Sequence, residues 1–292
     1  LMTLGANPEL LVLGYLRNQR LVRDVADIES ITVDWEVGAA AVKTRHGIAD
    51  IEEKTAHRVV TTGCGQGSVF GVLMDEVDQI ALPVDAALTQ SQLYGLVNTI
   101  RLKETTYKSA GSVHACALFS TASGEADMLL FVEDVGRHNA IDTIAGWMWV
   151  NEAPTLPAAR GSLPPEGALR LQPGEAGSAA PAGEEVQNSP ALAVSDAAAS
   201  TASGLVFYTT GRLTSEMVIK SAQMGVPVVV SRSGITQMGH QVAQLVGLCA
   251  IGRATHKRFL CYTHAERLRL EPGLVAMPSA FSASSAAEKN QE

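Results

Sequence analysis

Cysteine is scarce in this sequence, and the spacing that most often gives cysteines a metal or redox role is missing. The 292 residues contain four cysteines, and no two of them have C-x-x-C spacing. A zinc ribbon and a thioredoxin-type redox site are therefore not expected. Four cysteines in a chain of this length also make no disulfide scaffold, so reduced thiols in a cytoplasmic protein are predicted.

Basic residues and long apolar stretches are also few. Lysine and arginine number 22 against 30 aspartates and glutamates, which gives a net charge of −8. Nucleic acids and anionic membrane surfaces bind to basic faces, so we expect neither as a partner. No apolar run approaches the roughly 20 residues that span a bilayer. The first residues also lack the basic start and apolar core of a signal peptide, which again favours a cytoplasmic location.

The spacing of apolar residues predicts an α/β protein, and their 46% share is enough for a substantial core. From residue 205 to residue 251 the pattern is β-α-β-α-β, which implies parallel strands joined by right-handed crossovers. An antiparallel pair precedes it, so we predict a mixed sheet with flanking helices. The predicted strands are 31–35, 40–44, 57–61, 113–120, 128–132, 205–209, 226–231 and 248–251, and the predicted helices are 8–16, 88–103, 139–150, 215–224 and 236–246.

Residues 151–203 interrupt this pattern. Proline, alanine, glycine, serine and glutamate dominate there without an apolar period, which is typical of a disordered insertion. Residues 278–292 have the same character and are predicted to form a disordered tail. We accordingly divide the chain into an N-terminal α/β part, 1–110, and a core, 111–270, that the insertion interrupts.

A dense group of polar side chains lies between the predicted strand 128–132 and the predicted helix 139–150. Ligands of α/β sheets bind outside the carboxyl ends of the strands, and helix N-termini attract anions. The alternative is a capped turn, in which an aspartate and an asparagine satisfy backbone groups and Arg137 pairs with Glu133. The sequence leaves both interpretations open. The candidate ligand-binding residues are Glu133, Asp134, Arg137, His138 and Asn139.

Cys64 is the candidate reactive residue, because glycines flank it throughout the loop 62–67. Glycine permits positive φ angles, so such a loop can expose the thiol and let it move between partners. An exposed thiolate can attack a persulfide, hold the extra sulfur and pass it on. The alternative is a buried thiol that acts as a small apolar side chain. Burial is expected for the other three, Cys116, Cys249 and Cys261, which lie in apolar or strand-like runs.

Five blocks of the sequence, in the same order, resemble the formate dehydrogenase accessory sulfurtransferase (FdhD) family. Several ordered motifs together are a specific signal, whereas any one would be weak. The resemblance covers roughly residues 1–150 and 203–270. The blocks are S-V-H-A-C-A at 112–117, E-D-V-G-R-H-N-A-I-D at 133–142, G-R-L-T-S-E-M-V at 211–218, the segment G-V-P to S-R-S at 225–233, and Y-T-H at 262–264.

The resemblance implies a cytidine-deaminase-like core and a function in maturing an enzyme. Such proteins pass persulfide sulfur from a cysteine desulfurase to the molybdenum cofactor in its bis-molybdopterin guanine dinucleotide form, the bound substrate. Formate dehydrogenase then receives this cofactor. By resemblance Cys64 is the persulfide carrier and the protein is a homodimer. Family members also carry a strand-like segment before the part that resembles residue 1, so we expect the chain to lack such a segment.

Two departures from familiar patterns bear on the chemistry. The family has a C-x-x-C motif on the Cys64 loop, and Gly67 occupies the second cysteine position, so an intramolecular disulfide cannot release the sulfur. His114 and Cys116 stand where the zinc signature H-x-E of nucleobase deaminases has its histidine and glutamate. No P-C-x-x-C follows, so we expect no zinc and no bound metal. His114 remains a candidate for orienting a ligand or for a structural role.

A basic run near the C-terminus is the candidate phosphate-binding segment. Arginine forks and lysine charges suit phosphate groups, and by resemblance the matching segment contacts the guanine dinucleotide cofactor. The alternative is a solvated edge strand. Arg212, which precedes a predicted helix, is a second candidate because helix N-termini bind anions. The residues of the run are Arg253, Ala254, Thr255, His256, Lys257 and Arg258.

These observations predict a sulfurtransferase with Cys64 as its carrier. The missing second cysteine leaves open a cofactor-binding chaperone of formate dehydrogenase that transfers no sulfur. A hydrolase or deaminase acting on a guanine nucleotide is a third possibility, and stoichiometric zinc would be its sign.

Overall fold

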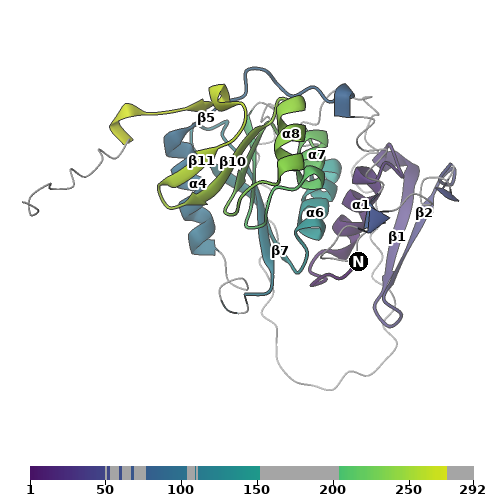
Figure 1. Ribbon diagram of the computed structural model, residues 1–292. Helices are drawn as coiled ribbons and strands as arrows, with labels where there is room; N and C mark the ends of the chain where they lie inside the picture. The colour runs from purple at the N-terminus through teal and green to yellow at the C-terminus, as the bar shows by residue number, and fades with distance from the viewer. Residues whose placement is uncertain are drawn as a thin grey trace, which may run out of the picture.

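A six-stranded mixed sheet forms the centre of the protein (Figure 1). The computed structural model describes residues 1–49, 51–52, 59–60, 67–68, 77–103, 109, 111–151 and 204–274. The strand order in the sheet is β11-β10-β9-β8-β6-β7. The strands are β6 (His114–Ser120), β7 (Asp127–Asp134), β8 (Leu205–Thr209), β9 (Val228–Ser231), β10 (Cys249–Thr255) and β11 (Arg258–Cys261).

The sheet contains both parallel and antiparallel strand pairs. β8, β9 and β10 pair in parallel, while β6 pairs antiparallel with both β7 and β8, and β11 pairs antiparallel with β10. Helices α7 (Ser215–Gln223) and α8 (Gln237–Leu245) connect the parallel strands. The predicted mixed sheet with flanking helices is therefore confirmed.

Helices cover both faces of the sheet (Figure 1). On one face, α4 (Gln90–Lys103) packs its leucines, valine and isoleucine against apolar residues of β6, β8, β9 and β10. On the other face lie α6 (Arg137–Val150), α7 and α8. The alternation of side chains along each strand thus places one apolar set in each of two cores.

Helix α1 (Pro8–Asn18) packs against the outer side of α6 rather than on the sheet. The two backbones touch, because a Cβ added at Gly14 would lie 1.6 Å from the carbonyl oxygen of Asp142, and one at Gly146 would lie 2.0 Å from that of Leu10. Only glycine fits at both positions. Beyond α1, the hairpin of β1 (Ile28–Asp34) and β2 (Ala39–Thr44) forms the outermost layer (Figure 1).

Short elements complete the described chain. They are η1 (Val25–Asp27), η2 (Val77–Gln79), η4 (Ala265–Arg267), η5 (Pro272–Leu274), β3 (Val59–Val60), β4 (Gly67–Ser68), β5 (Leu88–Thr89) and β12 (Leu268–Arg269). β3 pairs antiparallel with β4, and β5 pairs in parallel with β12.

Several predicted boundaries differ from the observed ones by a few residues, among them the starts of β1 and α6. The predicted helix 88–103 begins only at Gln90, because the two residues before it join β12 as a strand. The predicted strand 248–251 continues to Thr255, so part of the basic run belongs to a strand. The division at residue 110 stays a prediction, although α4 lies before it and packs on the sheet that follows it. The tail and almost all of the insertion lie outside the described residues.

Candidate functional site

The polar segments of the sequence converge on one edge of the central sheet. The parallel strands β8, β9 and β10 end there, and we refer to it as the carboxyl edge. Because β6 runs in the opposite direction, its first residue, His114, lies at this edge together with Asp134, the last residue of β7. Helices α6, α7 and α8 all begin there. The carboxyl edge is therefore where an α/β sheet of this kind offers a ligand site.

Asp134 and Asn139 hold the turn before α6 in place. Asp134 accepts hydrogen bonds from the backbone N–H of Gly136 at 3.0 Å, the amide of Asn139 at 2.8 Å and the backbone N–H of Leu4 at 3.2 Å. Its carboxylate also accepts from the hydroxyl of Thr3. These contacts match the capped-turn alternative for both residues. Their role as cofactor ligands stays a prediction.

Arg137 does not form the ion pair that the same alternative required. Among the described residues, Arg137 pairs with no carboxylate, and Glu133 lies partly buried opposite Ala115 in the β6–β7 ladder. The Arg137 side chain instead crosses Gly211, where an added Cβ would lie 2.7 Å from its Cδ. Its Nε atom is buried and has no hydrogen-bond partner in the described part of the chain.

His114 lies beside this arginine. The Nδ1 atom of His114 would be 3.4 Å from a Cβ at Gly211, and it too is buried without a hydrogen-bond partner among the residues that the structure describes. Burial, followed by the charge of Arg137, lowers the pKa of His114, so the imidazole is neutral. Buried polar atoms are normally satisfied. Two unsatisfied nitrogens at one place at the carboxyl edge therefore mark a position where a ligand can supply the missing partners.

A network of buried polar side chains extends from His138 away from the carboxyl edge. His138 Nε2 lies 3.5 Å from Glu216, whose other oxygen lies 3.2 Å from the Lys220 ammonium. That ammonium also lies 2.9 and 3.0 Å from the two oxygens of Asp142. Asn18 of α1 completes the network with a hydrogen bond of 2.7 Å to Asp142. The network thus links α1, α6 and α7 beneath the site.

The charges in this network are set by burial and by the attraction between its members. Burial lowers the pKa of His138 to about 3, so the imidazole is neutral. Burial alone would lower the pKa of Lys220, but Asp142 and Glu216 together raise it. Burial raises the pKa of Asp142, whereas for Glu216 the effect of burial is outweighed by the charge and the hydrogen bond of the Lys220 ammonium, which lower the pKa. Lys220 is therefore a charged ammonium held between carboxyl groups.

None of Glu216, Lys220 and Asp142 was predicted from the sequence as a candidate site residue. A signal was present, since Glu216 and Lys220 have the i, i+4 spacing of a helical ion pair. Their partner Asp142 lies 78 positions away from Lys220, so no local pattern shows the contact.

Arginines line the carboxyl edge from strand to strand. Arg137 follows β7, Arg212 follows β8, Arg232 follows β9, and Arg253 lies near the end of β10. The last three side chains are exposed. His114 on β6, beside Arg137, and Arg253 on β10 are on strands three spacings apart, about 14 Å at 4.8 Å per spacing. The row is therefore long enough for an extended ligand with separated anionic groups.

The basic run forms the turn between β10 and the edge strand β11. Arg253 and His256 both have positive φ, 51° and 53°, and the register shifts between Gly252 and Thr255. Ala254 is an exception in the run, because its side chain is 2% exposed and packs in the core under α4. The exposed members are Arg253, Thr255, His256, Lys257 and Arg258.

Cys64 lies outside the described residues, so its role stays a prediction. The pairing of β3 with β4 joins Val60 to Gly67, which places the flanks of residues 61–66 side by side. Within the described chain, no three histidine, cysteine, aspartate or glutamate side chains are grouped so that they could hold a metal ion. No helix in that part is both long and apolar enough to cross a membrane.

Comparisons of the sequence with known proteins point to one family. The sequence model of the FdhD/NarQ family matches residues 1–159 and 194–269. Sulfur carrier protein FdhD of Bacillus subtilis is 27% identical over 277 residues, which cover 92% of this chain and 84% of that protein. The protein of the same name from Sulfurisphaera tokodaii is 24% identical over 269 residues, with 92% and 83% covered.

A solved structure supports the same fold. The crystal structure of a candidate formate dehydrogenase accessory protein from Desulfotalea psychrophila superposes with a TM-score of 0.58 at 19% identity. The match covers 91% of this chain and 81% of the other. Since the family's sequence model spans most of the chain, this protein belongs to the FdhD/NarQ family.

Proposed function

We propose that this protein carries persulfide sulfur from a cysteine desulfurase to the bis-molybdopterin guanine dinucleotide cofactor that formate dehydrogenase needs. The observation that carries the proposal is the carboxyl edge of a chain of this family, where exposed arginines follow successive strands and two buried nitrogens have no hydrogen-bond partner among the described residues. Relatives named sulfur carrier protein FdhD support the transfer of sulfur.

Cys64 is the sulfur carrier in this proposal. Its thiolate attacks the terminal sulfur of the donor persulfide, a Cys64 persulfide forms, and the donor leaves as a thiolate. Because Gly67 stands where a second loop cysteine would be, the terminal sulfur passes directly, as sulfane sulfur, to the cofactor, which supplies the accepting electron pair while the S–S bond breaks toward Cys64. The Cys64 thiolate is then regenerated without an intervening disulfide.

The carboxyl edge binds the cofactor as substrate. Arg212, Arg253, Lys257 and Arg258 present exposed cationic groups, which suit the phosphates of a dinucleotide. Arg137 and neutral His114 lie beside Gly211, next to Arg212 and about three strands from the basic run, and can donate to a second part of the same ligand. The separation of the two groups favours a dinucleotide over a single phosphate. A homodimer would offer one such edge to each half of the bis-pterin cofactor.

Mass spectrometry of the intact protein tests the sulfur-carrying step. After incubation with a cysteine desulfurase and cysteine, we expect a gain of roughly 32 Da that reductant removes. A Cys64→Ser variant should show no gain, whereas Cys116→Ser, which alters a buried thiol, should still show it. A gain that persists in Cys64→Ser would contradict the assignment of the carrier.

Nucleotide binding tests the basic run independently. Arg258→Ala should weaken the binding of guanosine diphosphate, measured by calorimetry, while Cys64 still gains sulfur. Arg23, which is exposed in the segment after α1 and lies outside the basic run, provides the matched control variant Arg23→Ala. Equal affinities of the two variants and the unsubstituted protein would remove the basic run from the site.

A cofactor chaperone that transfers no sulfur is the second candidate, and Gly67 in place of the second cysteine is the observation that favours it. A Cys64→Ser variant that binds guanosine diphosphate and still activates formate dehydrogenase would establish the chaperone and refute the carrier. Loss of activation with normal binding would do the opposite.

A further inference from the structure

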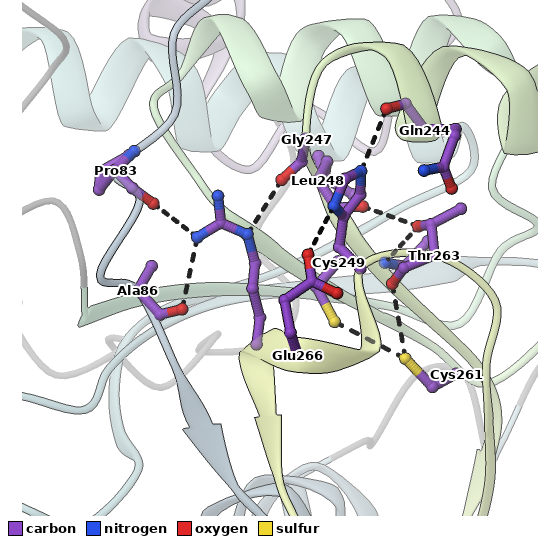
Figure 2. Close-up of polar contacts among 12 residues, drawn as sticks. Pro83, Ala86, Gln244, Gly247, Leu248, Cys249, Cys261, Thr263 and Glu266 are labelled. Carbon is purple, nitrogen blue, oxygen red and sulfur yellow. Dashed lines mark hydrogen bonds and ion pairs between the residues drawn. The ribbon is translucent and has the colours of Figure 1, made fainter.

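Two cysteines away from the Cys64 loop face one another across the edge of the sheet. Cys249 lies on β10 and Cys261 on β11, and their sulfur atoms are 3.8 Å apart (Figure 2). Cys261 is directly opposite Ile251 in the ladder, two residues from Cys249, so both side chains are on the face that α4 covers. The pair is a neighbouring dithiol, whereas Cys116 lies in the opposite core.

The two thiols differ in accessibility and in acidity. Cys249 is fully buried, whereas Cys261 is partly exposed on the edge strand. A hydrogen bond between the two sulfurs lowers the pKa of Cys261 and raises that of Cys249. Cys261 is therefore the thiol that ionises first and meets solvent, and Cys249 is a protonated neighbour behind it. An exposed nucleophile with a buried second thiol is the arrangement that thiol–disulfide exchange requires.

We propose that Cys249 and Cys261 form a reversible intrachain disulfide on exposure to a low-molecular-weight disulfide such as oxidised glutathione. The Cys261 thiolate attacks one sulfur of the reagent, a mixed disulfide forms, and one glutathione thiolate leaves. Cys249 then loses its proton and attacks the Cys261 sulfur, and the second glutathione leaves. Two protein thiols are oxidised, and one glutathione disulfide is reduced to two thiols.

The edge position of β11 permits the closure. The sulfur atoms must approach from 3.8 Å to about 2.05 Å, the length of a disulfide bond. Among the described strands, β11 has a neighbour on one side only, and its ladder with β10 is irregular between Gly252 and Thr255. A small shift of this edge strand therefore closes the gap without moving the central strands.

The disulfide would close a ring around the basic run, because residues 253–258 lie between the two cysteines. Oxidation would then restrict the segment that presents the phosphate-binding cations. This consequence rests on the proposed function, whereas formation of the disulfide does not.

Peptide mapping of the full chain tests the proposal. A Cys64→Ser variant, which removes the loop thiol, is incubated with oxidised glutathione, alkylated and digested. We expect a loss of about 2 Da, a reductant-sensitive link between the Cys249 and Cys261 peptides, and alkylation of Cys116 only after unfolding. Cys116 serves as the internal control, because burial raises the pKa of its thiol to about 12.

A second variant separates the two steps. In Cys64→Ser/Cys249→Ala, the Cys261 thiol should accumulate a stable glutathione adduct of roughly 305 Da, since no neighbour can resolve it. A persistent adduct on Cys261 when Cys249 is present would overturn the proposal. An absence of both link and adduct in the folded chain would overturn it as well. Neither result depends on Cys64, so the proposed sulfur transfer can fail while the disulfide forms.

Discussion

The buried ammonium of Lys220 offers the sharpest test of the interactions beneath the site. Lys220 lies within 3.2 Å of both Asp142 and Glu216, and its side chain is 0% exposed. Lys220→Met keeps most of the apolar stem and removes the charge. Two buried carboxyl groups, with side-chain exposures of 0% and 6%, would then face each other without a cation.

The expected loss of stability is the same whether it comes from the broken ion pair or from protonation of a carboxyl group. Removing one partner of a buried ion pair costs about 3–5 kcal/mol. The folded variant can alternatively protonate one carboxyl group, which at pH 7 costs about 4 kcal/mol for a group whose unfolded pKa is near 4. We therefore expect the free energy of unfolding to fall by about 4 kcal/mol at pH 7.

The pH dependence distinguishes this cause from a packing defect. In Lys220→Met the folded pKa of a carboxyl group lies above its unfolded value, so stability is lost as pH rises. At pH 5 the protonation cost is only about 1.4 kcal/mol, and the variant should regain more than half of the loss.

Urea denaturation at pH 5 and pH 7 measures both quantities. The triple variant Asp142→Asn/Lys220→Met/Glu216→Gln removes all three charges and should be more stable than Lys220→Met at pH 7. A loss of less than about 1 kcal/mol in Lys220→Met, or one that is equal at the two pH values, would refute the reasoning.

Other predictions address the helices and the connections. Burial holds the pKa of His138 at about 3, below its unfolded value of 6.5. The free energy of unfolding should therefore fall as the pH drops through this range, by at most about 1.4 kcal/mol per pH unit. In acid titrations of stability, His138→Asn should remove this dependence. Gly146→Ala should cost about 3 kcal/mol in urea denaturation because it separates two helices, whereas Gly95→Ala, with open space around it, should stabilise α4 by about 0.5 kcal/mol. Thr236→Ala removes a hydrogen bond of 3.1 Å that caps α8 and should cost about 1 kcal/mol by the same assay. Deleting residues 155–200 should leave sulfur loading intact, and a folded deletion variant that does not load would show that the segment is needed.

The parallel half of the fold could be predicted because its local signals agree. Apolar runs alternate with amphipathic helices, and Gly225 and Gly247 end α7 and α8 with φ of 76° and 72°. The polar turn before α6 was also found, since it follows a strand and precedes a helix. These features depend on residues that are neighbours in sequence.

Features made by packing could not be predicted. Gly14 and Gly146 each look like ordinary helix glycines, and only the contact of α1 with α6 shows why neither can be larger. Lys220 looks like a surface residue until α6 and α7 bury it against Asp142. His114 begins its strand rather than ending it, so its position at the carboxyl edge follows only from the reversed direction of β6.

The positions of Asn151 and Gly204 have a consequence for how the sequence can grow. α6 begins at the carboxyl edge and extends about 21 Å, so Asn151, which caps it, lies toward the opposite edge. Gly204 lies there too, since its carbonyl accepts a hydrogen bond of 2.8 Å from Thr121, just past the end of β6. A segment inserted between these two residues would start and end far from the carboxyl edge. The same point is therefore suited to the insertion of a fluorescent reporter domain that leaves the site uncovered.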